Sequence, residues 1–106
     1  MEISKETLGK VLKTPNGVDA YQGNSPLTVR VGLSLAANQL VQGRSPEDTM
    51  KAGKLLNRIK GENGNLHLKS EEVSFLKQMA AGSNAPSIYM QLYEVLEPDG
   101  DKEEDP

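Results

Sequence analysis

Apolar residues recur at helical spacing along most of the chain, and the densest run lies in residues 27–42. At about 100° per residue, these apolar positions form two separate stripes. A helix with two apolar stripes lies between two layers of a core, or between the core and another chain. We therefore expect the rest of the chain to be organised around this helix. The first stripe comprises Val29, Leu33, Ala36, Ala37 and Leu40, and the second comprises Leu27, Val31 and Leu35.

The next helix is predicted over residues 46–60. Ser45 is a typical N-cap residue, and Pro46 fits the first helical position, where its missing N–H is not needed. Gly43 is expected to end the preceding helix, since glycine is common just past a helix C-terminus. The helix has one apolar and one basic stripe. The apolar stripe is Ala52, Leu55, Leu56 and Ile59, and the basic stripe is Lys51, Lys54 and Arg58.

Two more helices are predicted over residues 70–81 and 86–96, after a short extended piece at residues 66–68. Ser70 is the expected N-cap of the first, because two glutamates follow it where the helix dipole favours acids. Gly82 is expected to end that helix. The fold class predicted from these patterns is mainly α, with about four helices.

A small β-hairpin or extended segment is predicted ahead of the helices. The pair Asn16-Gly17 is a strong turn signal, because both residues tolerate positive φ. Residues 11–12 and 18–21 flank this turn and would form the two strands. Residues 22–26 are expected to be a loop, since glycine and proline interrupt them.

Charge is distributed unevenly along the 106 residues. Residues 1–93 carry 11 basic and 8 acidic side chains, whereas the rest of the chain carries 1 and 7. We expect residues 1–97 to form a single helical domain, with residues 1–26 as an arm and 27–97 as the helical core. Residues 98–106 are predicted to be a disordered acidic tail. The acids of this tail are Asp99, Asp101, Glu103, Glu104 and Asp105.

Several function classes are disfavoured by the residue types present. The chain has no cysteine, which removes disulfides, thiolate metal sites and cysteine nucleophiles. The one histidine, His67, has no acid at ligand spacing, and no glycine loop matches a phosphate-binding motif. We therefore expect no catalytic residue, no metal site, no cofactor and no enzyme activity. No apolar run could span a membrane and no signal peptide opens the chain, so a cytoplasmic location is expected.

Two surfaces are candidates for binding. Apolar, tyrosine and methionine side chains beyond the needs of a narrow core stripe indicate a contact with a protein partner or a second copy, so a homo-oligomer is expected. The alternative is nucleic acid held by a basic patch. The partner or self-association surface is Leu27, Val31, Leu35, Tyr89, Met90 and Tyr93. The basic patch is Arg44, Lys51, Lys54, Arg58 and Lys60.

The order of short motifs is also informative. Pro26-Leu27-Thr28 opens one helix, SPEDTMKAGKLLNRI forms the next, LHLKSEEVSFLKQM follows, and a final aromatic-bearing helix ends in Leu-Glu. Over roughly residues 10–97 this order resembles small uncharacterised helical proteins encoded by tailed phages and prophages, except for the glycine-rich residues 61–65. The resemblance implies a phage-type origin and transfers no functional residue. It favours a non-enzymatic, oligomeric protein-binding module that acts as an assembly accessory or chaperone, or as an inhibitor of a host factor.

Overall fold

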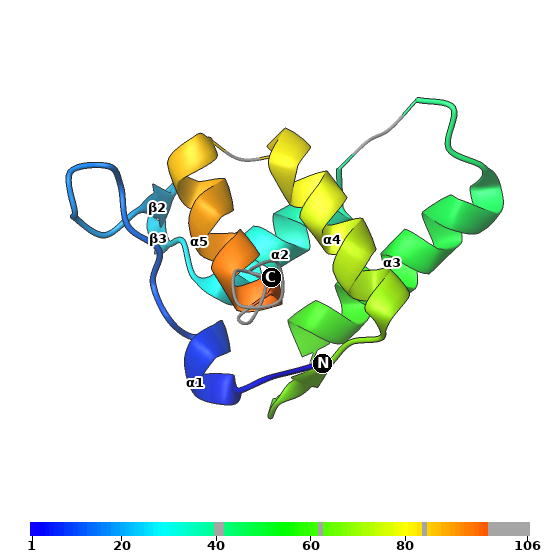
Figure 1. The fold of residues 1–106 in the computed structure, drawn as a ribbon, viewed down its shortest axis with the longest axis horizontal. Coiled ribbons are helices and arrows are strands. Elements are labelled where there is room, and N and C mark those ends of the chain that lie inside the picture. Colours follow the sequence, from blue (N-terminus) through cyan, green and yellow to red (C-terminus); the bar gives the residue numbers. More distant parts are fainter. Residues whose placement is uncertain (40–41, 62, 84, 98–106) are drawn as a thin grey trace, which may run out of the picture.

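A computed structural model describes residues 1–39, 42–61, 63–83 and 85–97 of the chain. The predicted acidic tail and Leu40 lie outside these residues. The described ranges are mainly helical, which confirms the predicted fold class (Figure 1). The elements in chain order are β1 (Glu2–Ile3), α1 (Lys5–Leu8), β2 (Tyr21–Gln22), β3 (Ser25–Pro26), α2 (Val29–Ala37), α3 (Pro46–Gly61), β4 (Leu66–His67), α4 (Ser70–Ser83) and α5 (Pro86–Leu96).

Helix α2 is the centre of the fold, because α3, α4 and α5 all pack against it (Figure 1). It begins where the side chain of Thr28 accepts a hydrogen bond of 3.2 Å from the backbone N–H of Val31. The described members of the first apolar stripe are buried, and Val29 and Leu33 are fully inaccessible to solvent. The predicted organising role of this segment is therefore confirmed.

The prediction of a helix over residues 27–42 was wrong at both ends. Leu27 precedes the N-cap, and the helix ends at Ala37 with Asn38 as its C-cap. The backbone N–H of Gln39 donates to the carbonyl of Ala36, three residues back, at 3.3 Å. This tighter turn closes the helix before Gly43, although Gly43 does adopt a positive φ of 82°.

The predicted hairpin around Asn16-Gly17 is confirmed. Gly17 has a φ of 83°, and the backbone N–H of Thr14 donates to the carbonyl of Val18 at 2.8 Å. Lys13 and Asp19 form an antiparallel bridge across the hairpin, and their side chains also form an ion pair. The turn is therefore where it was predicted, but the predicted strands are reduced to this isolated bridge, and Val11 pairs with Thr28 instead.

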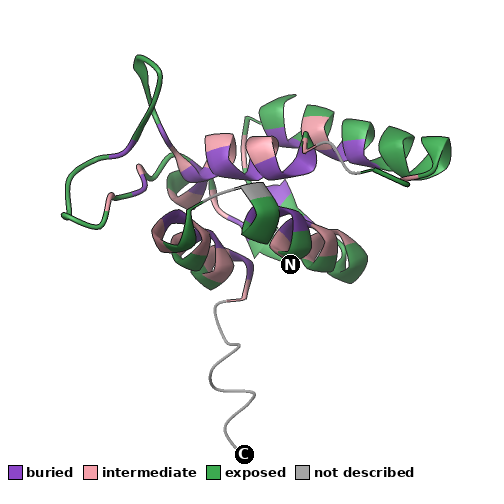
Figure 2. Ribbon diagram, turned by 90° about the horizontal axis from the view of Figure 1, so that it is seen from above, coloured by how far each residue is buried: buried purple, intermediate pink, exposed green. Residues whose placement is uncertain are grey.

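Residues 22–26, which were predicted to be a loop, belong to a second hairpin. Tyr21 lies opposite Pro26, and Gln22 lies opposite Ser25. Gly23, with a φ of 63°, makes the two-residue turn possible. The strands are only two residues long and lack an apolar alternation, so periodicity could not reveal them. The two hairpins form an arm that projects from the helices (Figures 1 and 2).

The base of the arm is fixed to α5 by the side chain of Gln91. Its Nε2 donates to the carbonyl of Lys13 at 2.8 Å, and its Oε1 accepts from the backbone N–H of Lys13 at 2.9 Å. Leu12 and Ala20, on either side of this point, are buried in the core. The base of the arm is therefore part of the folded body, whereas Val18 and Tyr21 further out are exposed.

The N-terminal residues pair with the connection between α3 and α4. Ile3 of β1 lies opposite Leu66 of β4 in antiparallel register, and both side chains are buried. The backbone N–H of Leu68 donates to the carbonyl of Met1 at 2.8 Å. The extended form of residues 66–68 was predicted, but its pairing partner was not, because sequence patterns do not report contacts over such a separation.

The start of α3 is as predicted, since the Ser45 hydroxyl accepts from the backbone N–H of Asp48 at 3.1 Å. At its other end, the Arg30 guanidinium of α2 donates to the carbonyl of Ile59 at 2.5 Å. A cation near the last carbonyls of a helix is favourable, because the helix dipole is negative there. This contact fixes the C-terminal end of α3 against α2.

The predicted limits of α4 need two corrections. The N-cap is not Ser70, because Ser70 is already the first residue of the helix. The carboxylate of Glu72 accepts from the backbone N–H of Lys69 at 2.8 Å, which is the bond that a residue at N3 makes to the N-cap. The helix also continues through Gly82 to Ser83. A Cβ at Gly82 would lie 2.7 Å from the side chain of Gln39, so this glycine permits a close approach and does not end the helix.

The core is apolar throughout the described ranges, where no polar or charged residue is buried. Figure 2 shows the buried positions on the inward faces of the helices and the exposed positions on their outer faces. The first turn of α3 is an exception to this pattern, because residues 46–51 are all exposed. This end of α3 therefore extends past the core, with Met50 62% exposed.

Candidate partner-binding groove

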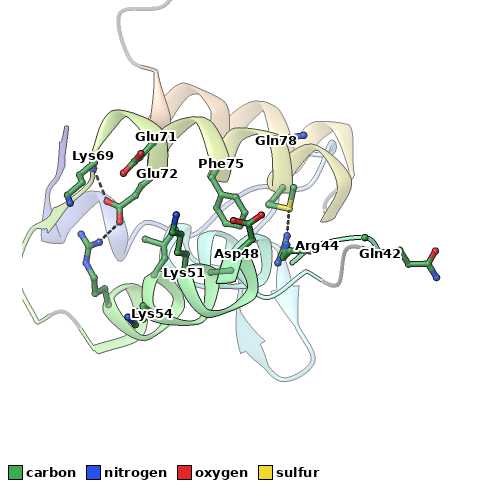
Figure 3. A pocket seen from close by; sticks show the side chains of 15 residues that line it. Gln42, Arg44, Asp48, Lys51, Lys54, Lys69, Glu71, Glu72, Phe75 and Gln78 are labelled. Atoms are coloured by element: carbon green, nitrogen blue, oxygen red, sulfur yellow. Dashed lines mark hydrogen bonds and ion pairs between the residues drawn. The ribbon is translucent and has the colours of Figure 1, made fainter. Parts of the chain in front are cut away.

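Helices α3 and α4 pack on α2 more extensively than on each other, and a groove of about 760 Å³ lies between them. The groove is therefore built from two helices that α2 holds apart. Its lining residues come from α3, from α4 with Lys69 just before it, and from the segment that leads into α3 (Figure 3).

The floor of the groove is apolar. Ala52 and Leu55 of α3 are 5% and 4% exposed, and Met79 of α4 is 9% exposed. Phe75 of α4 is only partly buried and packs against the edge of the core. A partly exposed phenyl ring beside a methionine is a typical contact point for another protein, because both supply a large apolar area.

One end of the groove is closed by Arg58. Its guanidinium bridges the two walls by donating to the carboxylate of Glu72 at 2.5 Å, and it also donates to the carbonyl of His67. Glu72 in turn accepts from the backbone N–H of Lys69, as Figure 3 shows. The charge of Glu72 is therefore already compensated within the chain.

The other end is formed by Arg44. Its guanidinium carbon lies 5.4 Å from the centre of the Phe75 ring, and its Nη2 lies 3.1 Å from the sulfur of Met79. Its Nη1 donates to the carbonyl of Gln39 at 3.4 Å. The Arg44 side chain thus holds Phe75 and Met79 in place beside the floor (Figure 3).

The two rims of the groove differ in charge. Lys51 and Lys54 of α3 are exposed, and neither takes part in an ion pair with any residue that the structure describes. Asp48 stands on the same wall, and Glu71 and Gln78 are exposed on the α4 wall. On the α4 side, Lys69 just before the helix also lines the groove and is exposed, so its charge offsets that of Glu71. The α3 rim therefore carries more positive charge than the α4 rim.

The groove contains four members of the predicted basic patch, whereas Lys60 is exposed elsewhere and does not line it. Sequence reasoning missed the apolar floor and the α4 wall. The available signals were Phe75 and Met79, apolar side chains beyond the needs of a narrow core stripe. Asp48 and Glu71 on the rims would repel phosphates, which makes this surface less suited to nucleic acid than the basic stripe alone suggested.

Only some residues of the predicted self-association surface are accessible to solvent. Leu27 is 7% exposed and belongs to the core of the single chain, so it is not available to a second chain. Val31 and Leu35 are partly buried against the core, and Met90 is 55% exposed. Contact with a second copy through Val31, Leu35 and Met90 stays a prediction.

The two tyrosines of that surface lie together on α5, with ring centres 6.0 Å apart. Tyr93 also lies under the ammonium group of Lys77, at 5.4 Å from the ring centre. Lys77 forms an ion pair with Glu97, which links α4 to the end of α5. Tyr93 therefore has a structural role within the chain.

The pKa of Glu97 is expected to be below its ordinary value of 4.5, chiefly because Lys77 donates a hydrogen bond to the carboxylate and secondly because Tyr93 does. A lowered pKa means that these contacts stabilise the fold above the unfolded-state pKa, and that this contribution is lost as the pH falls through the folded-state pKa. An NMR titration of the Glu97 side chain should show the lowered value. In Lys77→Met the pKa should rise toward 4.5. An unchanged value in that variant would contradict the assignment.

His67 has a neighbour that the sequence could not show, since its Nε2 lies 3.6 Å from the carboxylate of Glu2 across β1 and β4. Both side chains are well exposed. Within the described residues, no group of three or more His, Cys, Asp or Glu side chains could hold a metal ion. Nor is any helix there long and apolar enough to cross a membrane.

Comparison of the chain with protein-family models, with curated proteins and with solved structures found no match.

Proposed function

We propose that this chain is a non-enzymatic protein-binding module that receives a segment of a partner protein in the groove between α3 and α4. The observation that carries this proposal is the partly exposed ring of Phe75 in a groove between two charged rims. Ala52, Leu55 and Met79 of the floor are themselves buried, so Phe75 is the apolar side chain of the floor that a second molecule can reach.

The anatomy of the groove supports binding of protein. Interfaces typically combine an apolar centre with a polar rim, and their aromatic, methionine and arginine side chains contribute most of the binding energy. Phe75, Met79 and Arg44 provide this combination. The contacts of Arg44 hold the ring and the thioether in position, so little order has to be gained on binding.

The resemblance to small phage proteins indicates in which system the proposed module would act. In a phage, the module would serve as an assembly accessory or chaperone, or would bind and inhibit a host factor in the host cytoplasm. Assembly through a second copy of the chain is compatible with this role, since the groove and the surface formed by Val31, Leu35 and Met90 involve different residues.

The proposal is tested by photo-crosslinking in extracts of the organism that encodes the chain. A benzophenone side chain replaces Lys54 on the rim, and a matched probe replaces Asn57, which is exposed on α3 but does not line the groove. We expect a discrete crosslinked product from position 54 that is absent from position 57. The product should weaken in a Phe75→Ala background. The same products from both positions, or none from either, would overturn the proposal.

A further inference from the structure

Resting on the proposed function, we infer that the groove binds an amphipathic α-helix of the partner whose apolar stripe lies on the floor and whose acidic flank faces Lys51 and Lys54. The inference depends on the backbone chemistry of the groove, on its shape and on its unbalanced charge.

The walls of the groove favour a helix over an extended segment. Both walls are α-helices, whose backbone groups are already hydrogen-bonded within α3 and α4. An extended segment would find no strand edge to pair with, so its own N–H and C=O groups would be buried without partners. A helix satisfies these groups internally and presents only side chains to the groove.

The spacing of the floor residues also suits a helix. Ala52 and Leu55 are three positions apart on α3, while Phe75 and Met79 are four positions apart on α4. Such pairs form ridges, and an apolar side chain of a third helix can insert between them. From Asp48 to Arg58 the α3 wall extends about 15 Å, which matches about three turns of a bound helix.

The charge of the rims determines which helix fits best. On the α3 rim, Lys51 and Lys54 are exposed and form no ion pair with any described residue, whereas Arg58 is paired with Glu72. A partner helix with acids on the flank facing α3 would complement these lysines. Its other flank would face Glu71 and Lys69, whose opposite charges offset each other, so an acid there gains less than beside Lys51 and Lys54. The two rims therefore favour one orientation of the bound helix.

The test uses two synthetic helical peptides of about 14 residues, long enough to cover the groove. Both have leucines at positions i, i+3, i+4 and i+7, and one flank carries glutamates in the first peptide and lysines in the second. Binding to the full chain is measured by fluorescence anisotropy, and the site is located by backbone amide NMR shifts. We expect the acidic peptide to bind about tenfold more tightly than the basic one. The shifts should concentrate on residues 48–58 and 69–79.

Two double variants distinguish a specific effect of the rim lysines from an effect of the net charge of the chain. Lys51→Glu/Lys54→Glu should weaken the acidic peptide about tenfold and strengthen the basic one. Lys10→Glu/Lys60→Glu changes net charge equally at exposed positions outside the groove and should leave both affinities unchanged. Circular dichroism confirms that each variant is folded.

The inference fails if both peptides bind equally, if the two variants behave alike, or if the shifts lie outside the groove. It also fails if single-stranded DNA of equal charge binds more tightly than the acidic peptide and is released by Lys51→Glu/Lys54→Glu. If the peptides fail while the probe at position 54 still crosslinks a discrete partner, the protein-binding function stands and the helical occupant is wrong.

Discussion

Replacing Leu33 by alanine is expected to lower the free energy of unfolding by about 3 kcal/mol. Leu33 lies in the middle of α2 and is fully buried, in contact with the core to which every helix contributes. The lost methyl groups leave a cavity that the surrounding helices cannot close completely. A domain of this size is stable by only about 5–15 kcal/mol, so the loss is a large fraction of the total. Urea unfolding followed by circular dichroism measures it.

Leu35→Ala is the matched control, because Leu35 lies two residues further along the same helix and is only partly buried. We expect it to cost less than about 1 kcal/mol. This contrast separates the two apolar stripes of α2. If both variants lose the same stability, the second stripe is core like the first, and the prediction that Leu35 contacts another chain is wrong.

The difference between these two leucines shows what the sequence could and could not establish. Helical periodicity identified the buried stripe of α2 and also that of α3, because burial of one face is a local property of each helix. The ends of the helices were less predictable. Helix α2 ends at Ala37, well before Gly43, and Gly82 lies inside α4, where the side chain of Gln39 approaches it closely.

Only the α3 side of the candidate groove was predictable from the sequence. The basic residues of α3 and Arg44 were identified, because charge at helical spacing is visible in the sequence. The opposite wall was not, because the angle between α3 and α4 follows from tertiary contacts. The Arg30 contact to Ile59 and the pairing of β1 with β4 place these two helices. Phe75 packs against the edge of the core and also lines the groove, a position that depends on how the two helices are placed.

A close approach between α2 and α5 leads to the second large effect. A Cβ at Gly32 would lie 3.0 and 3.1 Å from the two methyl groups of Leu92 and 3.5 Å from Leu12. Gly32→Val would push two further methyl groups into this contact. Because Leu92 is fully buried within the core, it cannot move without displacing other core side chains. We expect a loss of about 2–3 kcal/mol in the free energy of unfolding, measured by urea denaturation.

Gly53→Val is the control, because Gly53 lies within α3 and a Cβ there would meet nothing within 4 Å. Valine has a somewhat higher helix propensity than glycine, so this variant should be unchanged or more stable by a few tenths of a kcal/mol. The same substitution thus has opposite consequences at two helical glycines, because only one lies where two helices touch. An equal loss at both positions would mean that valine disfavours the helices themselves, and that α2 and α5 do not approach as closely as Gly32 and Leu92 indicate.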